Sequence, residues 1–141
     1  MNSFFAKNEK ETQEFAEKIA KILKPGMVLA LIGDLGTGKT TFTRYLGKAL
    51  GATERITSPT FTIVQEYRTG VVPIFHFDVY RIGGIEEMED IGYEEYFYGE
   101  AITVVEWADM IEEILPEDTI KIYIEMGESE GRSYKIQGAD L

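Results

Sequence analysis

Apolar positions along the chain follow helical spacing in some segments and strand spacing in others, which predicts a mixed α/β fold. Helical spacing predicts an amphipathic helix over 12–23, ended by Pro25 and Gly26, and a second helix over 40–50, ended by Gly51. Strand patterns occupy 27–32, 61–67, 72–79, 101–105, 120–125 and 133–136. The continuous apolar run at 27–32 is typical of a strand that is covered on both faces, as in a parallel sheet.

Two acidic segments have weaker helical patterns. Residues 86–98 predict a helix that Gly92 weakens, and residues 112–115 predict the end of a short helix before Pro116. The turn at 68–70 and the last two strands predict antiparallel hairpins. We therefore expect one domain over residues 1–141, with parallel strands around the loop at 33–40 and antiparallel strands beside them.

A glycine-rich loop joins the strand at 27–32 to the helix at 40–50. Its spacing, Gly33 followed by four residues and then Gly38-Lys39-Thr40, is the Walker A pattern in the strand–loop–helix context that this motif requires. Glycines let backbone amides approach a phosphate closely, and the N-terminus of the helix adds positive potential. We therefore predict a bound nucleoside triphosphate with Mg²⁺, contacted by Asp34, Leu35, Gly36, Thr37, Gly38, Lys39, Thr40 and Thr41.

The side chains around this loop have separate expected roles. Lys39 supplies a mobile point charge to the β- and γ-phosphates, and the Thr40 hydroxyl is a hard oxygen ligand for Mg²⁺. A phosphate loop also needs an acidic partner at the end of a neighbouring strand, and two apolar runs end in one, Asp78 and Glu106. One acid would ligate Mg²⁺, directly or through water, while the other orients or activates the attacking water. The predicted metal-site residues are Thr40, Asp78 and Glu106, and the predicted catalytic residues are Lys39, Asp78 and Glu106.

For three residues beside these acids, the sequence leaves two roles open. His76 is the one histidine of the chain, and we favour a structural role over a catalytic one. Trp107 either packs in the core or shapes the nucleotide pocket. Arg81 either faces phosphate or pairs with the acidic segment that follows it.

Charge is unevenly distributed along the chain. The net charge of −11 divides into +3 for residues 1–81, which hold 11 Lys and Arg against 8 Asp and Glu, and −14 for residues 82–141, which hold 3 against 17. This acidity argues against strong autonomous binding of nucleic acid, which needs clustered Lys and Arg. The acidic part is either a solvated face, which we favour, or a docking surface for a basic partner.

Composition narrows the class of protein further. The chain has no cysteine, which excludes disulfides, thiolate metal sites and cysteine nucleophiles. No apolar run reaches the roughly 20 residues of a membrane span. Residues 1–8 become polar too early for a signal peptide. We expect a cytoplasmic protein that does not associate with membranes.

Five blocks of residues occur in order along nearly the whole chain: Gly33 to Phe42, Ser58 to Thr62, His76 to Arg81, Val105 to Trp107, and Gly131 with Arg132. Taken together, and in this order, these blocks resemble the TsaE (YjeE) family, the P-loop ATPases of tRNA threonylcarbamoyladenosine biosynthesis. The Walker A block alone would identify only a superfamily, whereas its combination with the other blocks is specific. Thr37 stands where many family members carry Ala, at a variable position of the loop.

The resemblance implies a single-domain P-loop NTPase fold, in which helices flank a mixed, mostly parallel sheet with an antiparallel hairpin extension. It also implies ATP or ADP with Mg²⁺ as the ligand. It assigns residues to three places: the metal site (Thr40, Asp78 and Glu106), the nucleotide (Thr12 and Arg132), and a switch segment near the γ-phosphate (Ser58 and Thr60).

The resemblance further implies protein partners. The family acts with TsaD and TsaB, which transfer a threonylcarbamoyl group to the adenosine beside the anticodon in tRNAs that read ANN codons. TsaE-like proteins do not perform that transfer, and their ATPase activity is weak until they dock on the TsaB–TsaD pair. An acidic protein in a tRNA pathway fits this role, because it would bind a partner protein rather than hold tRNA itself.

Two other functions share the same loop. A small-molecule kinase needs an acceptor pocket and a basic lid, and residues 82–141 contain only Lys121, Arg132 and Lys135 as basic residues. A non-catalytic nucleotide switch would control a partner through its bound state rather than through turnover. The two acids Asp78 and Glu106 favour turnover over such a switch.

Overall fold

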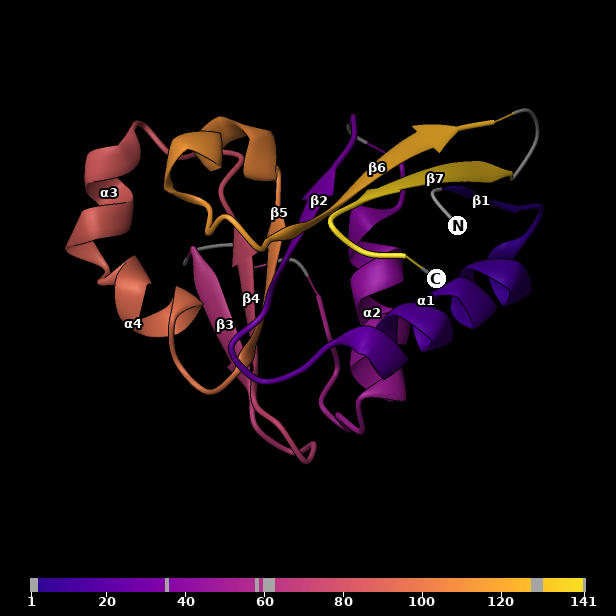
Figure 1. The fold of residues 1–141 in the computed structure, drawn as a ribbon, viewed down its shortest axis with the longest axis horizontal. Coiled ribbons are helices and arrows are strands. Elements are labelled where there is room, and N and C mark those ends of the chain that lie inside the picture. The colour runs from indigo at the N-terminus through magenta and orange to yellow at the C-terminus, as the bar shows by residue number, and fades with distance from the viewer. Residues whose placement is uncertain (1–2, 35, 58, 60–62, 128–130, 141) are drawn as a thin grey trace.

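The computed structural model describes residues 3–34, 36–57, 59, 63–127 and 131–140. A seven-stranded sheet runs through the centre of the protein (Figure 1). In chain order the strands are β1 (Ser3–Ala6), β2 (Val28–Ile32), β3 (Val64–Tyr67), β4 (Ile74–Asp78), β5 (Ile102–Glu106), β6 (Ile120–Met126) and β7 (Arg132–Gln137). Across the sheet their order is β1-β7-β6-β2-β5-β4-β3.

The middle of the sheet is parallel and its two sides are antiparallel. Strands β6, β2, β5 and β4 pair in parallel, whereas β1–β7, β6–β7 and β3–β4 pair antiparallel. β5 is buried at every position and β2 at all but its last, as expected for apolar runs that are covered on both faces. The predicted α/β class, with parallel strands around the phosphate loop and an antiparallel extension, is confirmed.

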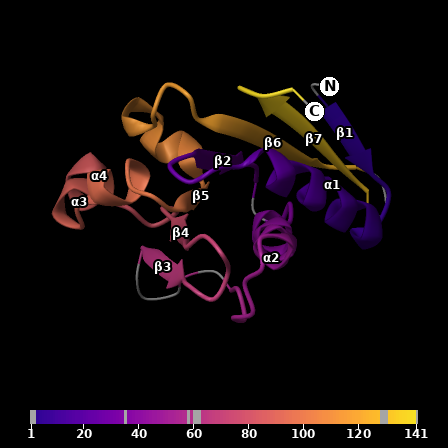
Figure 2. The ribbon, with the colours of Figure 1, turned by 60° about the horizontal axis from the view of Figure 1, so that its bottom comes forward.

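Helices cover both faces of the sheet. α1 (Glu9–Ile22) and α2 (Lys39–Ala49) lie side by side, and α3 (Ile85–Asp90), α4 (Tyr93–Phe97) and the 3₁₀ helix η1 (Ala108–Ile114) lie apart from them (Figure 2). Alternate residues of β2 enter two separate hydrophobic clusters: Leu29 and Leu31 pack with α1 and α2, and Val28 and Ala30 with the other helices. The clusters therefore lie on opposite faces of the sheet.

The helices within the described ranges include none with the length and apolar character needed to cross a bilayer.

The sequence pattern does not predict β1. This short strand pairs with β7 at the edge of the sheet, where Ala6 is buried and Phe5 is exposed. Phe4 stacks on Phe15 of α1, with 4.9 Å between the ring centroids. β1 therefore depends on contacts with segments that are distant in the chain, which a local pattern does not record.

The acidic segment differs from its prediction. It forms two short helices, so the single helix predicted over 86–98 is wrong. Gly92 separates α3 from α4, because its φ of +72° lies in the left-handed region that favours glycine. The short helix predicted to end within 112–115 is η1, which begins at Ala108 and ends at Ile114. α1 begins at Glu9 rather than at residue 12, because the Asn8 side chain caps it by accepting a hydrogen bond from the Glu11 backbone N–H (3.0 Å).

The packing of aromatic rings around Phe15 can be tested by substitution. Phe15 is fully buried, and its ring centroid lies 4.9 Å from that of Phe4, 4.6 Å from that of Tyr134 and 5.7 Å from that of Phe42. We expect Phe15→Ala to lower the free energy of unfolding by about 3–5 kcal/mol, because it removes a ring from among three aromatic neighbours. Phe5→Ala, at an exposed ring, should change it by about 0.5 kcal/mol or less. Urea denaturation measures both, and equal losses would contradict the packing.

Candidate functional site

The phosphate loop leaves the end of β2 and enters α2. Gly36 and Gly38 have φ angles of +83° and +94°, which side chains rarely tolerate. A Cβ atom on Gly38 would lie 2.7 Å from Nε of Arg132. That Nε donates a hydrogen bond to the Thr37 carbonyl (2.6 Å), so β7 supports the loop from outside. Leu35, also predicted to contact nucleotide, lies outside the described residues.

The Lys39 ammonium is folded back against the loop. Its Nζ donates to the carbonyls of Gly33 (2.6 Å) and Asp34 (2.9 Å), and it lies 3.9 Å from the centroid of the Trp107 ring. Burial lowers the pKa of Lys39, while the nearby carboxylates of Glu106 and Asp78 act in the opposite direction. Lys39 is therefore a cation with few solvent contacts, for which phosphate oxygens are suitable partners.

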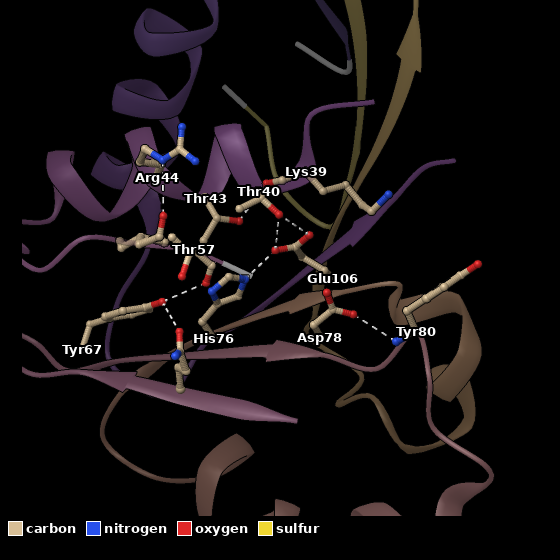
Figure 3. A network of polar contacts seen from close by, with 12 residues as sticks. Lys39, Thr40, Thr43, Arg44, Thr57, Tyr67, His76, Asp78, Tyr80 and Glu106 are labelled. Atoms are coloured by element: carbon tan, nitrogen blue, oxygen red, sulfur yellow. Dashed lines mark hydrogen bonds and ion pairs between the residues drawn. The ribbon is translucent and has the colours of Figure 1, made fainter. Parts of the chain in front are cut away.

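A hydrogen bond joins the phosphate loop to β5. The Thr40 hydroxyl lies 2.9 Å from Oε1 and 3.1 Å from Oε2 of Glu106, to which it donates (Figure 3). On its other side, Glu106 Oε2 lies 2.5 Å from Nε2 of His76 on β4. Glu106 and His76 are both almost completely buried. The first helical turn after the loop is thus connected through one carboxylate to two strands of the sheet.

Asp78 lies next to Glu106 because the two residues are register partners on the parallel strands β4 and β5. Its Oδ1 accepts a hydrogen bond from the Tyr80 backbone N–H (3.0 Å). Burial raises the pKa of Asp78 above its ordinary value of 3.8, and the negative charge of Glu106 raises it further. The structure therefore brings the two predicted acids together at the carboxyl edge of the sheet, beside Thr40.

These oxygen donors suit magnesium. Within the described ranges, no three or more His, Cys, Asp or Glu side chains gather into a group that would hold a metal by themselves. Mg²⁺ does not need such a group beside a nucleotide, because it is usually held by one or two carboxylates together with substrate phosphates and water. The Thr40 hydroxyl keeps lone pairs for a cation while its proton points at Glu106. Thr40, Glu106 and Asp78 thus fit Mg²⁺ bound to a triphosphate.

The other residues predicted near the nucleotide are less closely grouped. Thr41 is half-buried in the first turn of α2. Thr12 is buried in α1, where its hydroxyl lies 3.2 Å from that of Tyr134 on β7. Nucleotide contacts by Thr12 and Thr41 remain predictions. Ser58 and Thr60, the predicted γ-phosphate sensors, lie outside the described residues.

Trp107 belongs to the site, a placement that the sequence left undecided. Besides its contact with the Lys39 ammonium, its ring packs on Tyr80 with 4.5 Å between centroids. Trp107 has a φ of +63°, and it is the one non-glycine residue with positive φ among those described. Such backbone strain is found where surrounding contacts hold a side chain in place, often at functional sites. Arg81 is exposed at the surface.

Sequence reasoning missed the polar side chains that hold the segment after α2. The Tyr67 hydroxyl lies 3.2 Å from the Thr57 carbonyl and 2.8 Å from Oε1 of Gln65, and Arg44 Nε donates to the Ile56 carbonyl (3.3 Å) (Figure 3). These contacts connect residues 56 and 57 to both β3 and α2. A tyrosine in an alternating strand carries no local signal of this role, because one of its partners is a backbone carbonyl ten residues earlier.

Comparison with known proteins identifies the family. A family model described as threonylcarbamoyl adenosine biosynthesis protein TsaE matches residues 6–134. The tRNA threonylcarbamoyladenosine biosynthesis protein TsaE of Bacillus subtilis (strain 168) is 50% identical over 117 residues, which cover 83% of this chain and 73% of that protein. The protein of the same name from Treponema pallidum (strain Nichols) is 38% identical over 117 residues, covering 83% and 86%.

A solved structure agrees with these sequence matches. The crystal structure of Bacillus subtilis YdiB superposes with a TM-score of 0.76 at 41% identity, covering 95% of this chain and 82% of that one. The family model spans most of the chain, and the motifs on which the resemblance was based all fall inside its range. The chain belongs to the TsaE family of tRNA threonylcarbamoyladenosine biosynthesis proteins.

Proposed function

We propose that this protein binds ATP with Mg²⁺ and hydrolyses it, and that it serves threonylcarbamoyladenosine formation on tRNA in the cytoplasm through TsaB and TsaD. The observation that carries the nucleotide part is the bond between Thr40 and Glu106, with Asp78 alongside. It supports a metal site beside a phosphate loop whose glycines already have the required backbone angles. The pathway is that named for the relatives of this chain.

Binding depends on the loop and on Lys39. Backbone amides at the N-terminus of α2, which begins at Lys39, carry partial positive charge and would face the phosphates. Lys39 would exchange its two carbonyl acceptors, those of Gly33 and Asp34, for β- and γ-phosphate oxygens. This exchange favours the bound state, because an anion is a stronger acceptor for a buried ammonium than a neutral carbonyl.

The two acids Glu106 and Asp78 have separate proposed roles, one toward the metal and one toward the attacking water. Mg²⁺ neutralises charge on the β- and γ-phosphates when it is bound. We assign Glu106 to the metal, because it is the acid that contacts the Thr40 hydroxyl. We assign Asp78 to the attacking water, because its raised pKa makes it a better acceptor for a proton of that water than an ordinary carboxylate. The choice that sequence left open between the two acids is thereby resolved in our proposal.

Partner dependence is supported by charge and by the resting position of Lys39. Residues 82–141 carry a balance of −14, which suits a basic protein surface better than tRNA. The Lys39 ammonium lies on the loop backbone and the Trp107 ring, so this side chain must turn before it can contact the phosphates. We therefore expect slow hydrolysis by the protein alone and faster hydrolysis when TsaB–TsaD docks.

The direct test measures phosphate release from ATP by the purified protein, with and without TsaB–TsaD. Release that rises with the partner complex is the expected result. Transfer of labelled phosphate to a nucleoside or metabolite would instead show a kinase. Stimulation of the modification reaction by a non-hydrolysable ATP analogue, equal to that by ATP, would show a switch that does not need turnover.

Lys39→Ala tests nucleotide binding by the loop. We expect kcat/KM for ATP to fall by about 100-fold or more, because the loop loses the charge that faces the β- and γ-phosphates. Lys48→Ala removes an exposed lysine from the last turn of the same helix and serves as the matched control. Wild-type affinity and turnover in Lys39→Ala would refute the assignment of the loop.

Glu106→Gln and Asp78→Asn together test the division of roles. Glu106→Gln should raise the Mg²⁺ concentration needed for nucleotide binding by about tenfold or more, because it removes a metal-site carboxylate. Asp78→Asn should lower kcat by about 10²–10⁴-fold and leave the Mg²⁺ dependence of binding near that of wild type. Titration of Mg²⁺ against bound ADP, beside steady-state kinetics, separates the two effects. The reverse pattern would exchange the assigned roles.

The raised pKa of Asp78 also predicts how the free energy of unfolding of Asp78→Asn, compared with wild type, depends on pH. The folded state holds the Asp78 proton more tightly than the unfolded state, so the wild type loses stability as pH rises from 3.8 through the raised pKa. The asparagine variant has no such loss. We expect the difference in free energy of unfolding to move in favour of the variant across that window and to stay constant above it.

Urea unfolding at a series of pH values between about 4 and 8 measures this difference. Asp118→Asn, at an exposed position, serves as the control for loss of a carboxylate. A difference between Asp78→Asn and wild type that is the same at every pH would contradict the account.

A further inference from the structure

The one histidine of the chain lies behind the metal-site carboxylate. His76 has no exposed surface, and its Nε2 is 2.5 Å from Oε2 of Glu106 (Figure 3). His76 is two residues before Asp78 on β4, so the two side chains point to the same face of the sheet. In register His76 pairs with Val104 and Asp78 with Glu106, so the imidazole lies two positions before Glu106 along the paired strands.

The surroundings of the ring determine which nitrogen carries its proton. His76 Nδ1 is buried and has no hydrogen-bond partner in the part of the chain that the structure describes. A proton on Nδ1 would therefore be buried without an acceptor, whereas a proton on Nε2 points directly at Glu106. The hydrogen bond thus runs from Nε2–H to Oε2 of the carboxylate.

This bond limits how the Glu106 carboxylate can turn. Oε2 accepts from His76, and both oxygens lie within reach of the Thr40 hydroxyl. With donors on two sides, the carboxylate keeps one orientation, in which Oε1 faces the phosphate loop. Without His76, nothing on the β4 side among the described contacts of Glu106 would hold Oε2, and the buried carboxylate would lose a donor as well.

We propose that His76 is a positioning residue of the metal site, which donates from Nε2 to Glu106 and so holds that carboxylate toward Thr40 and the Mg²⁺ of the nucleotide. The proposal rests on the proposed Mg²⁺–nucleotide function. The chemistry is that of hydrogen-bonded ligands in other metal sites, where loss of the outer partner lowers metal affinity by about 10–100-fold. The buried Nδ1 supports this role over plain packing, since an apolar side chain would fill the position without leaving a polar atom unpaired.

Two substitutions separate positioning from packing. In His76→Gln the side-chain amide nitrogen occupies approximately the place of Nε2 and can still donate to Glu106. In His76→Asn it occupies approximately the place of Nδ1, from which Glu106 is out of reach. We expect His76→Asn to raise the half-saturating Mg²⁺ concentration by about 10–100-fold and His76→Gln to stay within about threefold of wild type.

The readout is fluorescence of Trp107, the one tryptophan, during Mg²⁺ titration of the ADP complex, so that no turnover is involved. Ile74→Ala serves as the control for lost stability, because Ile74 is buried on the same strand and the same face, further from the phosphate loop. It should lower the thermal midpoint and leave the Mg²⁺ response unchanged. Equal Mg²⁺ affinity in His76→Asn and wild type, or equal losses in the two His76 variants, would overturn the proposal.

A second measurement does not depend on nucleotide or on the folding of a variant. In protein labelled with ¹⁵N-histidine, the only imidazole signals belong to His76. We expect Nε2 to show the shift and the attached proton of a protonated nitrogen, and Nδ1 to show neither. A proton on Nδ1 in the wild type would overturn the proposal. Absence of any Mg²⁺ or nucleotide response in the wild type, with Nε2 protonated, would instead refute the proposed function.

Discussion

The hydrogen bond between Thr40 and Glu106 connects the two parts of the molecule on which its function depends. Thr40 lies in the first turn after the phosphate loop, and Glu106 ends β5, which is buried at every position. Parallel pairing of β2 with β5 places Glu106 opposite Leu31, close to where the loop begins. In our proposal a phosphate bound with Mg²⁺ would contact the loop at the same point at which the loop is joined to the core. Asp78 and His76 approach that point from the next strand.

The site contains charges that do not favour folding. Two carboxylates on adjacent strands repel one another, and burial opposes the charged forms of both Asp78 and Lys39. The protein tolerates them because two large hydrophobic clusters, one on each face of the sheet, stabilise the strands that carry them. The charges of the proposed ligand are opposite to those of the site, because phosphates would contact Lys39 and a divalent cation would contact the two acids. Binding is then expected to relieve both the repulsion between the carboxylates and the cost of burying the Lys39 ammonium.

The sequence predicted those features whose causes are local. Gly33, Gly38, Lys39 and Thr40 have a fixed spacing, and mostly apolar strands end in Asp78 and Glu106. The sequence therefore predicted that both acids end strands of the sheet, and the structure pairs them in register. Their roles remain proposals. Contacts between distant segments were not predictable in this way. They include the pairing of β1 with β7, the place of Trp107 over Lys39, and the bond from His76 to Glu106. Each depends on the register of strands and on side-chain direction, which one sequence does not record. The sequence marked a weak point in the helix at Gly92. That the helix ends there depends on the left-handed conformation of this glycine.

The central claim is that Thr40 and Glu106 are the protein ligands of the metal and that Asp78 acts on the attacking water instead. A crystal structure with Mn²⁺ and ADP tests it most directly, because Mn²⁺ can replace Mg²⁺ at oxygen ligands and is located by its anomalous scattering. The account predicts that the metal would contact the Thr40 hydroxyl, with Glu106 as its nearest carboxylate and still bonded to His76. A metal held by Asp78, with Glu106 turned away from Thr40, would contradict it.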